Sequence, residues 1–366
     1  NPDPSICRVG DDFFIATSTF EWFPGVQVHH SRDLAHWRLL CRPLDRISQL
    51  DLRGNRDSGG VWAPCLTWHG GLFYLVYTDT KGFWQPYNDQ HNYLVTAPDI
   101  LGPWSEPIPL VHGGFDPSLF HDEDARSWLL WLQWDHRLDR NHFGGIMLQE
   151  FDRHAKTLVG AARKIFTGTE LGKTEGPHLY RRRDWYYLMT AEGGTSYDHA
   201  VTLARSRTID GPYEVHPENP LLTSRGAPDH PLQKAGHGSL VETQHGEWYL
   251  THSLGRPVGP HRRCILGRET ALQKCRWDAD DWLRLAEGGC EPQLEVQSPK
   301  LPAYPFQPPP ERNDFDLAML PSEFQTLRVP SDDSWLSLTE RPGWLRLRGR
   351  DSPASLHRHA LVGRRI

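Results

Sequence analysis

The amino-acid sequence predicts an all-β protein, namely a five-bladed β-propeller followed by the beginning of a truncated C-terminal β-sandwich domain. Three observations predict this fold. One unit recurs five times along the 366 residues. Each copy contains short aromatic and β-branched runs bounded by Gly, Pro and Asp, which is the local signal of strands. No long run with the helical period of 3.6 residues competes with these strands.

The repeat is defined by a lead residue that opens each copy, and successive lead residues are 60, 53, 60 and 61 positions apart. The five lead residues are Asp3, Ala63, Asp116, Gly176 and His237. Each begins a short strand, which a polar turn connects to an aromatic strand such as 73–77 or 185–188. Five antiparallel units of four strands lie within the usual 4–8 blades of a propeller.

A third run follows in every copy, and we expect it to form the third strand of its blade. These runs are 26–28, 93–95, 146–149, 201–204 and 264–266. The period is longer than the ~40–50 residues of common propeller repeats, so the connections should be long. Long connections on such a scaffold often carry function.

The character of the sequence changes after Pro292. We assign residues 1–297 to the propeller, 298–312 to a proline-rich linker in extended conformation, and 313–366 to the N-terminal part of a β-sandwich. Strands are expected at 335–338 and 344–348. About 50 residues are too few for a complete sandwich, so we expect this domain to be incomplete.

The charge balance argues against a nucleic-acid partner. Lys plus Arg is 40 and Asp plus Glu is 46, which gives a net charge of −6. The basic run 181–183 is expected to be a solvated loop. No apolar run approaches the ~18 residues of a membrane span, so no membrane partner is expected.

Cysteine usage bears on the compartment. The six cysteines show neither CxxC spacing nor the density of a disulfide scaffold. Reduced thiols predict a cytoplasmic protein. The first residues do not form a signal peptide, and because they lack an initiator Met we expect a trimmed start.

Carboxylates stand at or beside the repeated lead positions. The first strand of each propeller blade lines the central channel, so we expect Asp3, Asp116, Glu175 and His237 to converge at one end of it. Among crowded carboxyls the least solvated stays protonated while its neighbours ionise. Hydrolysis of a glycosidic bond needs one protonated carboxyl for the leaving oxygen and one carboxylate to activate water.

Other chemistries lack their motifs. The sequence contains no GxGxxG after a strand, no GxxxxGK[ST] and no HExxH. It also has no GxSxG nucleophile elbow. Taken singly, Asp before Pro is a common turn residue and His237 could be a core histidine. Three acids at equivalent positions of one repeat favour a site.

Longer motifs follow one another in order along the propeller and beyond it. They are Asn-Pro-Asp-Pro-Ser at 1–5, Ser-Thr-Phe-Glu-Trp-Phe-Pro-Gly-Val at 18–26, Gly-Gly-Val-Trp-Ala-Pro at 59–64, 114–122, 174–180, 190–195, 233–237, 266–271, 324–328 and 335–343. Together they resemble the β-xylosidase branch of glycoside hydrolase family 43. The resemblance implies an inverting five-bladed propeller enzyme with an appended β-sandwich.

The resemblance also implies roles for individual residues. By motif match, Asp3 would be the general base that activates water and Glu175 the general acid. Asp116 would orient the acid and hold its pKa up. Arg268 would bind sugar hydroxyls with its fixed fork of donors.

Further residues would shape the pocket in the same way. Phe20, Trp62 and Trp134 would wall it and stack on pyranose faces. His237 would lie at its floor, where relatives can hold water or a metal ion such as calcium. A lone histidine is a poor calcium site, so such an ion would be held mostly through water. No cofactor is expected to be required.

The resulting hypothesis is an exo-acting β-1,4-xylosidase that releases xylose from the non-reducing ends of xylo-oligosaccharides by an inverting single displacement. Three alternatives within enzymes are an α-L-arabinofuranosidase, an enzyme with both activities and an endo-arabinanase. A non-catalytic carbohydrate-binding propeller is the alternative from another class, and it would need no converging acids. The expected partner is a small oligosaccharide, and a homo-oligomer is left open.

Overall fold

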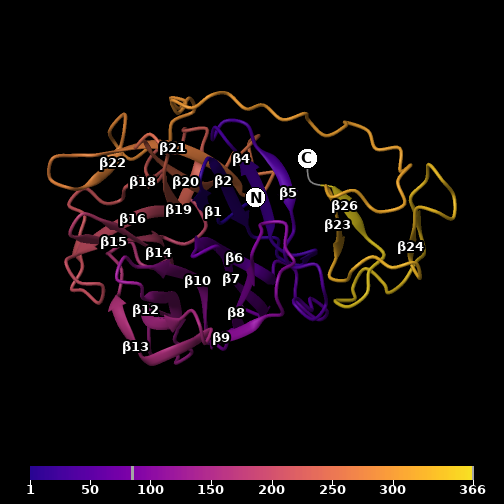
Figure 1. Cartoon of the computed structure of the whole chain (residues 1–366), viewed down its shortest axis with the longest axis horizontal. Coiled ribbons are helices and arrows are strands. Elements are labelled where there is room, and N and C mark those ends of the chain that lie inside the picture. Colours follow the sequence, from indigo (N-terminus) through magenta and orange to yellow (C-terminus); the bar gives the residue numbers. More distant parts are fainter. Residues whose placement is uncertain (84–85, 365–366) are drawn as a thin grey trace.

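Five antiparallel sheets form the blades of a propeller in the computed structural model, which describes residues 1–83 and 86–364 (Figure 1). The first two blades are β1 (Ser5–Val9), β2 (Asp12–Thr17), β4 (Gln27–Ser31) and β5 (Arg38–Cys41), then β6 (Gly60–His69), β7 (Leu72–Gly82), β8 (Asp89–Ala97) and β9 (Ile108–His112). The third is β10 (Gly114–His121), β11 (Ser127–Trp134), β12 (Phe143–Asp152) and β13 (Thr157–Phe166). The fourth is β14 (Glu175–Arg182), β15 (Trp185–Glu192), β16 (Ala200–Ser206), β17 (Glu214–Val215) and β18 (Leu222–Thr223), and the fifth is β19 (Gln233–Glu242), β20 (Trp248–Gly255), β21 (Glu269–Trp277) and β22 (Leu283–Leu285).

The first strands of the blades form a closed ring. β1 lies against β6, β6 against β10, β10 against β14 and β14 against β19, and β19 returns to β1. Serine hydroxyls connect neighbouring strands of the ring, because Leu66 N donates to Ser5 Oγ at 3.1 Å and Ile6 N donates to Ser239 Oγ at 3.1 Å. The predicted five-bladed propeller is confirmed.

The five lead residues of the repeat share one backbone conformation. All have positive φ, from 35° at Ala63 to 57° at Asp3. In blades two to five the pairing of the first two strands also shifts register across the lead residue. Such a bulge bends the strand and re-aims a side chain. The equivalence inferred from spacing therefore holds in three dimensions.

Apolar clusters fill every junction between neighbouring blades. One example is the edge-to-face pair of Phe14 and Phe73 between blades one and two, with ring centroids 5.8 Å apart. The other clusters include Cys65 and Trp131, Leu130 and Leu188, Val201 and Leu250, and Ile15 and Tyr249. Packed junctions of this kind fix the angle between blades and so the positions of the inner strand ends.

Two expectations from the sequence are wrong. The run 264–266 is not the third strand of blade five, which is β21, beginning at Glu269. The run instead closes a turn in which Gly267 N donates to Cys264 O at 2.9 Å, and Ile265 is 75% exposed. The basic run 181–183 is not a loop either, since Arg181 and Arg182 end β14.

The remaining chain extends to one side of the propeller (Figure 1). The expected linker has no strand, and its Tyr304 N donates to Asp33 Oδ2 of blade one at 2.7 Å. Next come β23 (Phe324–Leu327), β24 (Leu336–Ser337), β25 (Arg346–Leu347) and β26 (Val362–Arg364). β23 pairs with β26 and also with β3 (Trp22–Phe23) of the propeller. A small core around Trp335 supports this part.

No helix in the described part of the chain is long and apolar enough to cross a membrane. The six cysteines are all free thiols.

Candidate active site

The backbone at the bulged strand starts presents the three carboxylates. Asp3 and Asp116 have φ of 57° and 55°, which is uncommon outside glycine and tends to occur at functional sites. Glu175 directly precedes the equivalent position in blade four, which is Gly176. A Cβ at Gly176 would lie 2.9 Å from Cε1 of His237, so the close approach of this ring requires glycine there.

Asp3 is held as a carboxylate. The residue is 5% exposed, and its side chain accepts a 2.6 Å hydrogen bond from Ser18 Oγ on Oδ2 and pairs with the Arg268 guanidinium through Oδ1. His237 Nδ1 lies 3.9 Å from the same Oδ1. Burial alone would raise the pKa of this carboxyl, but the charges of Arg268 and His237 and the Ser18 hydrogen bond outweigh it. The pKa of Asp3 is therefore below its usual value.

Glu175 is held as an acid. Burial is the main cause, and the nearby negative charge of Asp3 adds to it. Arg268 and Lys173 oppose the effect without cancelling it, and the pKa of Glu175 rises to about 8. Two carboxyls of one buried cluster are thus displaced in opposite directions, which separates an acid from a base.

The negative charge of Glu175 acts on Asp116. Burial, the charge of Glu175 and the charge of Asp3 raise the pKa of Asp116 well above its usual value, while a hydrogen bond from the Gly176 amide lowers it. The amide of Asp116 is fixed by donating to Thr78 Oγ1 at 3.2 Å. Because the pKa of Glu175 is about 8 and that of Asp116 is also raised, this pair of carboxyls retains a proton at neutral pH. The proposed role of Asp116 as modulator stays a prediction.

The three aromatic residues predicted to wall the site contact Phe115 or Arg268. Trp62 and Trp134 lie on either side of Phe115, with centroids 5.7 and 6.2 Å from its ring. Trp62 Nε1 donates to Ser58 O at 2.8 Å, which orients the indole. Phe20 is joined to the residue before Trp62 by two backbone hydrogen bonds with Val61, and its ring centroid lies 5.7 Å from the Arg268 guanidinium. The predicted wall residues thus come from three different blades or loops, and Arg268 links Phe20 to Asp3.

His237 lies beside Asp3 among other buried imidazoles. Its ring centroid is 6.5 Å from that of His178, and burial lowers the pKa of His237 while Asp3 opposes this. Calcium takes 6–8 oxygen ligands. Within residues 1–83 and 86–364 no group of three or more His, Cys, Asp or Glu side chains could hold a metal ion. The side chains here do not fit a directly coordinated Ca²⁺, and we assign no chemical step to one.

Sequence reasoning missed two polar supports of the site. Ser18 stands at the start of a quoted motif, yet only the structure shows that it donates to Asp3 while accepting from Ala63 N at 2.8 Å. Thr78 donates to Asn92 Oδ1 at 2.7 Å behind Asp116. Both act across strands that are far apart in sequence, so no local pattern indicates them.

Comparison with known proteins places the chain among relatives of known class. Residues 1–283 match the family described as glycosyl hydrolases family 43, and residues 312–366 match the "Beta xylosidase C-terminal Concanavalin A-like domain". A β-xylosidase of Bacillus subtilis (strain 168) is 53% identical over 374 residues, covering 100% of this chain and 70% of that protein. "Xylosidase/arabinosidase 43B" of Humicola insolens is 54% identical over 365 residues, covering 100% and 67%.

A solved structure agrees in fold. The crystal structure of xylan β-1,4-xylosidase from Bacillus halodurans C-125 superposes with a TM-score of 0.98 at 59% sequence identity, covering 100% of this chain and 70% of that chain. The buried acid and base, the propeller that presents them and the match over most of the sequence lead to one assignment. The chain belongs to glycoside hydrolase family 43.

Proposed function

We propose that this protein is an exo-acting β-1,4-xylosidase that removes xylose from the non-reducing ends of xylo-oligosaccharides with inversion at the anomeric carbon. The observation that carries the proposal is the opposite displacement of two pKa values in one buried cluster. Asp3 is lowered and Glu175 is raised to about 8. Near neutral pH the first is a base and the second still carries its proton.

The reaction follows from these protonation states. A water attacks the anomeric carbon while Asp3 accepts its proton. The bond from that carbon to the glycosidic oxygen breaks as Glu175 donates its proton to this oxygen. One displacement therefore gives a sugar of inverted configuration and a neutral leaving alcohol. Arg268 keeps Asp3 ionised, and donors that remain on its guanidinium can meet sugar hydroxyls.

Exo action is supported by the segment that follows Phe20. This segment contains β3, which pairs with β23, and Gln325 Nε2 donates to Pro24 O at 3.0 Å. The C-terminal part is therefore tied to a loop beside the carboxylates. A pocket bordered in this way suits a chain end, whereas endo action on arabinan needs an open groove.

The relatives support the choice of sugar. The Bacillus subtilis relative is named a β-xylosidase, and the Bacillus halodurans structure is described as a xylan β-1,4-xylosidase. The Humicola insolens name includes arabinosidase as well as xylosidase. An additional activity on α-L-arabinofuranosides is therefore the second candidate, because the two sugars can present similar hydroxyls to one pocket.

The decisive experiment compares Asp3→Asn and Glu175→Gln with Asp184→Asn, which removes an exposed carboxylate from a turn. Each site variant should lower kcat/KM on an aryl β-xyloside by at least about 10³-fold, and the control should stay within about twofold. NMR of the wild-type reaction should show the α-anomer of xylose first. Initial release of the β-anomer, or near-normal rates in either site variant, would disprove the proposal.

A further inference from the structure

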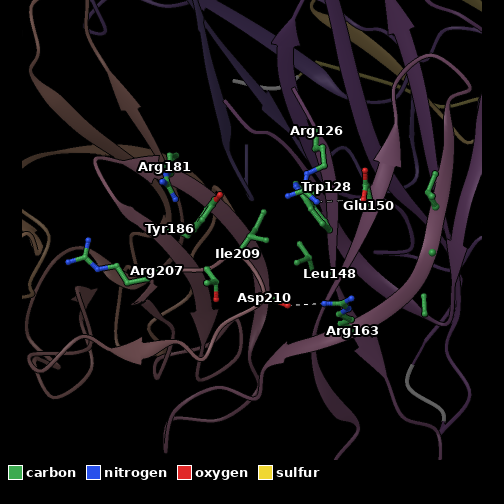
Figure 2. Close-up of a pocket in the computed structure, with 14 residues that line it drawn as sticks. Arg126, Trp128, Leu148, Glu150, Arg163, Arg181, Tyr186, Arg207, Ile209 and Asp210 are labelled. Carbon is green, nitrogen blue, oxygen red and sulfur yellow. Dashed lines mark hydrogen bonds and ion pairs between the residues drawn. The ribbon is translucent and has the colours of Figure 1, made fainter. Parts of the chain in front are cut away.

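A groove between the third and fourth blades lies outside the catalytic cluster. It has a volume of about 470 Å³ and contains none of the carboxylates or aromatic wall residues described above. Figure 2 shows its two walls, with Trp128 and Leu148 on the side of blade three and Tyr186 and Ile209 on the side of blade four. Ligand sites commonly have volumes of about 300–1,000 Å³.

The strand registers place arginines beside aromatic rings in both walls. Arg181 is directly opposite Tyr186 in the β14–β15 pair, and its guanidinium lies 4.2 Å from the ring centroid. Arg126 immediately precedes β11, and its guanidinium lies 4.9 Å from the ring of Trp128. Cation–π contacts restrict both guanidinium groups, so less freedom is lost when they bind an anion.

The lining carries more positive than negative charge. Its charged side chains are Arg126, Arg163, Arg181, Arg207, Glu150 and Asp210. Arg163 pairs with Asp210 at 2.8 Å, an ion pair that connects the two walls in Figure 2. Arg126 pairs with Asp124 at 2.8 Å outside the lining and with Glu150 at 3.9 Å within it. Arg181 has no carboxylate at ion-pair distance among the residues that the structure describes.

Both walls also leave a hydrogen-bond donor unused. Nε of Arg181 and Nε1 of Trp128 are buried and have no acceptor within the described part of the chain. A buried donor without a partner is costly, and most such groups in proteins are satisfied by protein, water or a ligand. An acceptor that enters the groove could meet these donors after small rotations of the side chains.

We propose that this groove is an accessory site for an oxyanion carried on a sugar-sized molecule. The guanidinium fork of Arg181 matches the geometry of a carboxylate or a phosphate. Each wall offers an apolar side chain, Leu148 or Ile209, and an aromatic ring, Trp128 or Tyr186, and these suit the body of a sugar. The proposal goes beyond the glycosidase reaction and does not depend on it.

The test measures binding by isothermal titration and not hydrolysis. Glucuronate and glucose 6-phosphate are the two anionic probes, and glucose is the neutral probe. Arg181→Gln removes the unpaired cation from the groove. Arg183→Gln is the matched control, because it removes the same charge from an exposed arginine nearby that pairs with Asp281 outside the groove. Trp128→Phe keeps a ring and removes the unused Nε1 donor.

At least one anionic probe should bind the wild-type protein more tightly than glucose does. Arg181→Gln should weaken that binding about tenfold or more, and Arg183→Gln by less than about twofold. Binding of glucuronate alone would identify a carboxylate, and binding of glucose 6-phosphate alone would identify a phosphate. If Arg181→Gln fails to fold, Trp128→Phe should still weaken binding several-fold. Equal binding of glucose, equal weakening by both arginine variants, or no binding up to about 10 mM would overturn the proposal.

Discussion

At the scale of single residues, the chemistry depends on which carboxyl keeps its proton. Asp3 and Glu175 are both buried, yet among the residues that the structure describes an arginine contacts Asp3 and none contacts Glu175. Burial by itself would raise the pKa of both carboxyls. At Asp3 the charges of Arg268 and His237 and the hydrogen bond from Ser18 outweigh burial, so its pKa is lowered. One guanidinium placed on one carboxylate therefore distinguishes base from acid in a cluster of similar side chains.

The pH dependence of catalysis follows from these directions. The proposed mechanism needs Asp3 ionised and Glu175 protonated, so activity should rise with pH through the lowered pKa of Asp3 and fall as pH passes about 8, the pKa of Glu175. A profile of kcat/KM against pH on an aryl β-xyloside measures both limbs. Activity that stays level from pH 7 to about 10 would contradict the role of Glu175 as acid.

A substitution at Ser18 tests the acidic limb of the pH profile, which the pKa of Asp3 sets. Its hydroxyl donates to Asp3 Oδ2 at 2.6 Å, so Ser18→Ala should raise the pKa of Asp3 and move the acidic limb to higher pH, with kcat about tenfold lower. Ser5→Ala is the matched control, because Ser5 Oγ also accepts an inter-blade amide bond, from Leu66 N, without contacting a catalytic carboxyl. An acidic limb that stays in place in Ser18→Ala would show that this hydrogen bond does not tune the base.

At the scale of elements, the short pairing of β3 with β23 connects the C-terminal part to the site. The next residue, Arg328, is 1% exposed and donates from Nε to Asn55 O at 2.8 Å. Its other end pairs with Asp57. The carbonyl of the neighbouring Ser58 accepts the bond that orients Trp62. Arg328 therefore supports a turn that orients Trp62, one of the residues proposed to bind the sugar.

Arg328→Met should show this support directly. The variant leaves the Asn55 carbonyl without its donor, so the free energy of unfolding should fall by about 1–3 kcal/mol. KM should rise more than kcat falls if Trp62 binds the substrate as proposed, since the indole takes no part in proton transfer. Arg348→Met is the control, since that arginine is exposed and pairs with Glu340, and it should change stability by less than about 0.5 kcal/mol. An unchanged KM in Arg328→Met would show that Arg328 does not position Trp62 for substrate binding.

The elements also show what the sequence could and could not predict. The lead residues and Glu175 could be identified from the sequence because each opens a short strand followed by a turn and an aromatic strand. This unit recurs five times along the chain. The pairing of Trp22 with Leu327 could not be predicted from the sequence. The two residues lie far apart along the chain, and a strand of two residues has no periodic pattern. The run 264–266 has strand composition, but a turn into Gly267 overrides it.

The groove between blades three and four also depends on contacts that local sequence patterns do not predict. Arg181 and Tyr186 are close in sequence and could have been paired by a hairpin argument. Trp128 reaches the same groove only because blades three and four pack side by side. Local composition indicated a solvated loop at 181–183, whereas the hairpin register places Arg181 beside an aromatic ring.

At the scale of the whole molecule, the site exists only while the ring of blades is closed. Asp3 belongs to blade one, whereas its partners His237 and Arg268 belong to blade five. The two blades meet without chain continuity, through contacts that include Ile6 N donating to Ser239 Oγ. Opening this seam would separate the base from the cation that keeps it ionised, even if every blade stayed folded.

Ser239→Ala tests this dependence, with Ser5→Ala as the control at the junction of blades one and two. Each variant leaves one inter-blade amide without its acceptor and should lower the free energy of unfolding by about 1–3 kcal/mol. In a urea titration, Ser239→Ala should lose activity at lower urea than it loses β-sheet circular dichroism, because the seam opens before the blades unfold. In Ser5→Ala the two midpoints should coincide, since the chain itself holds blades one and two together. Coincident midpoints in both variants would mean that the blades unfold as one unit and that the seam has no separate role in holding Asp3 beside Arg268.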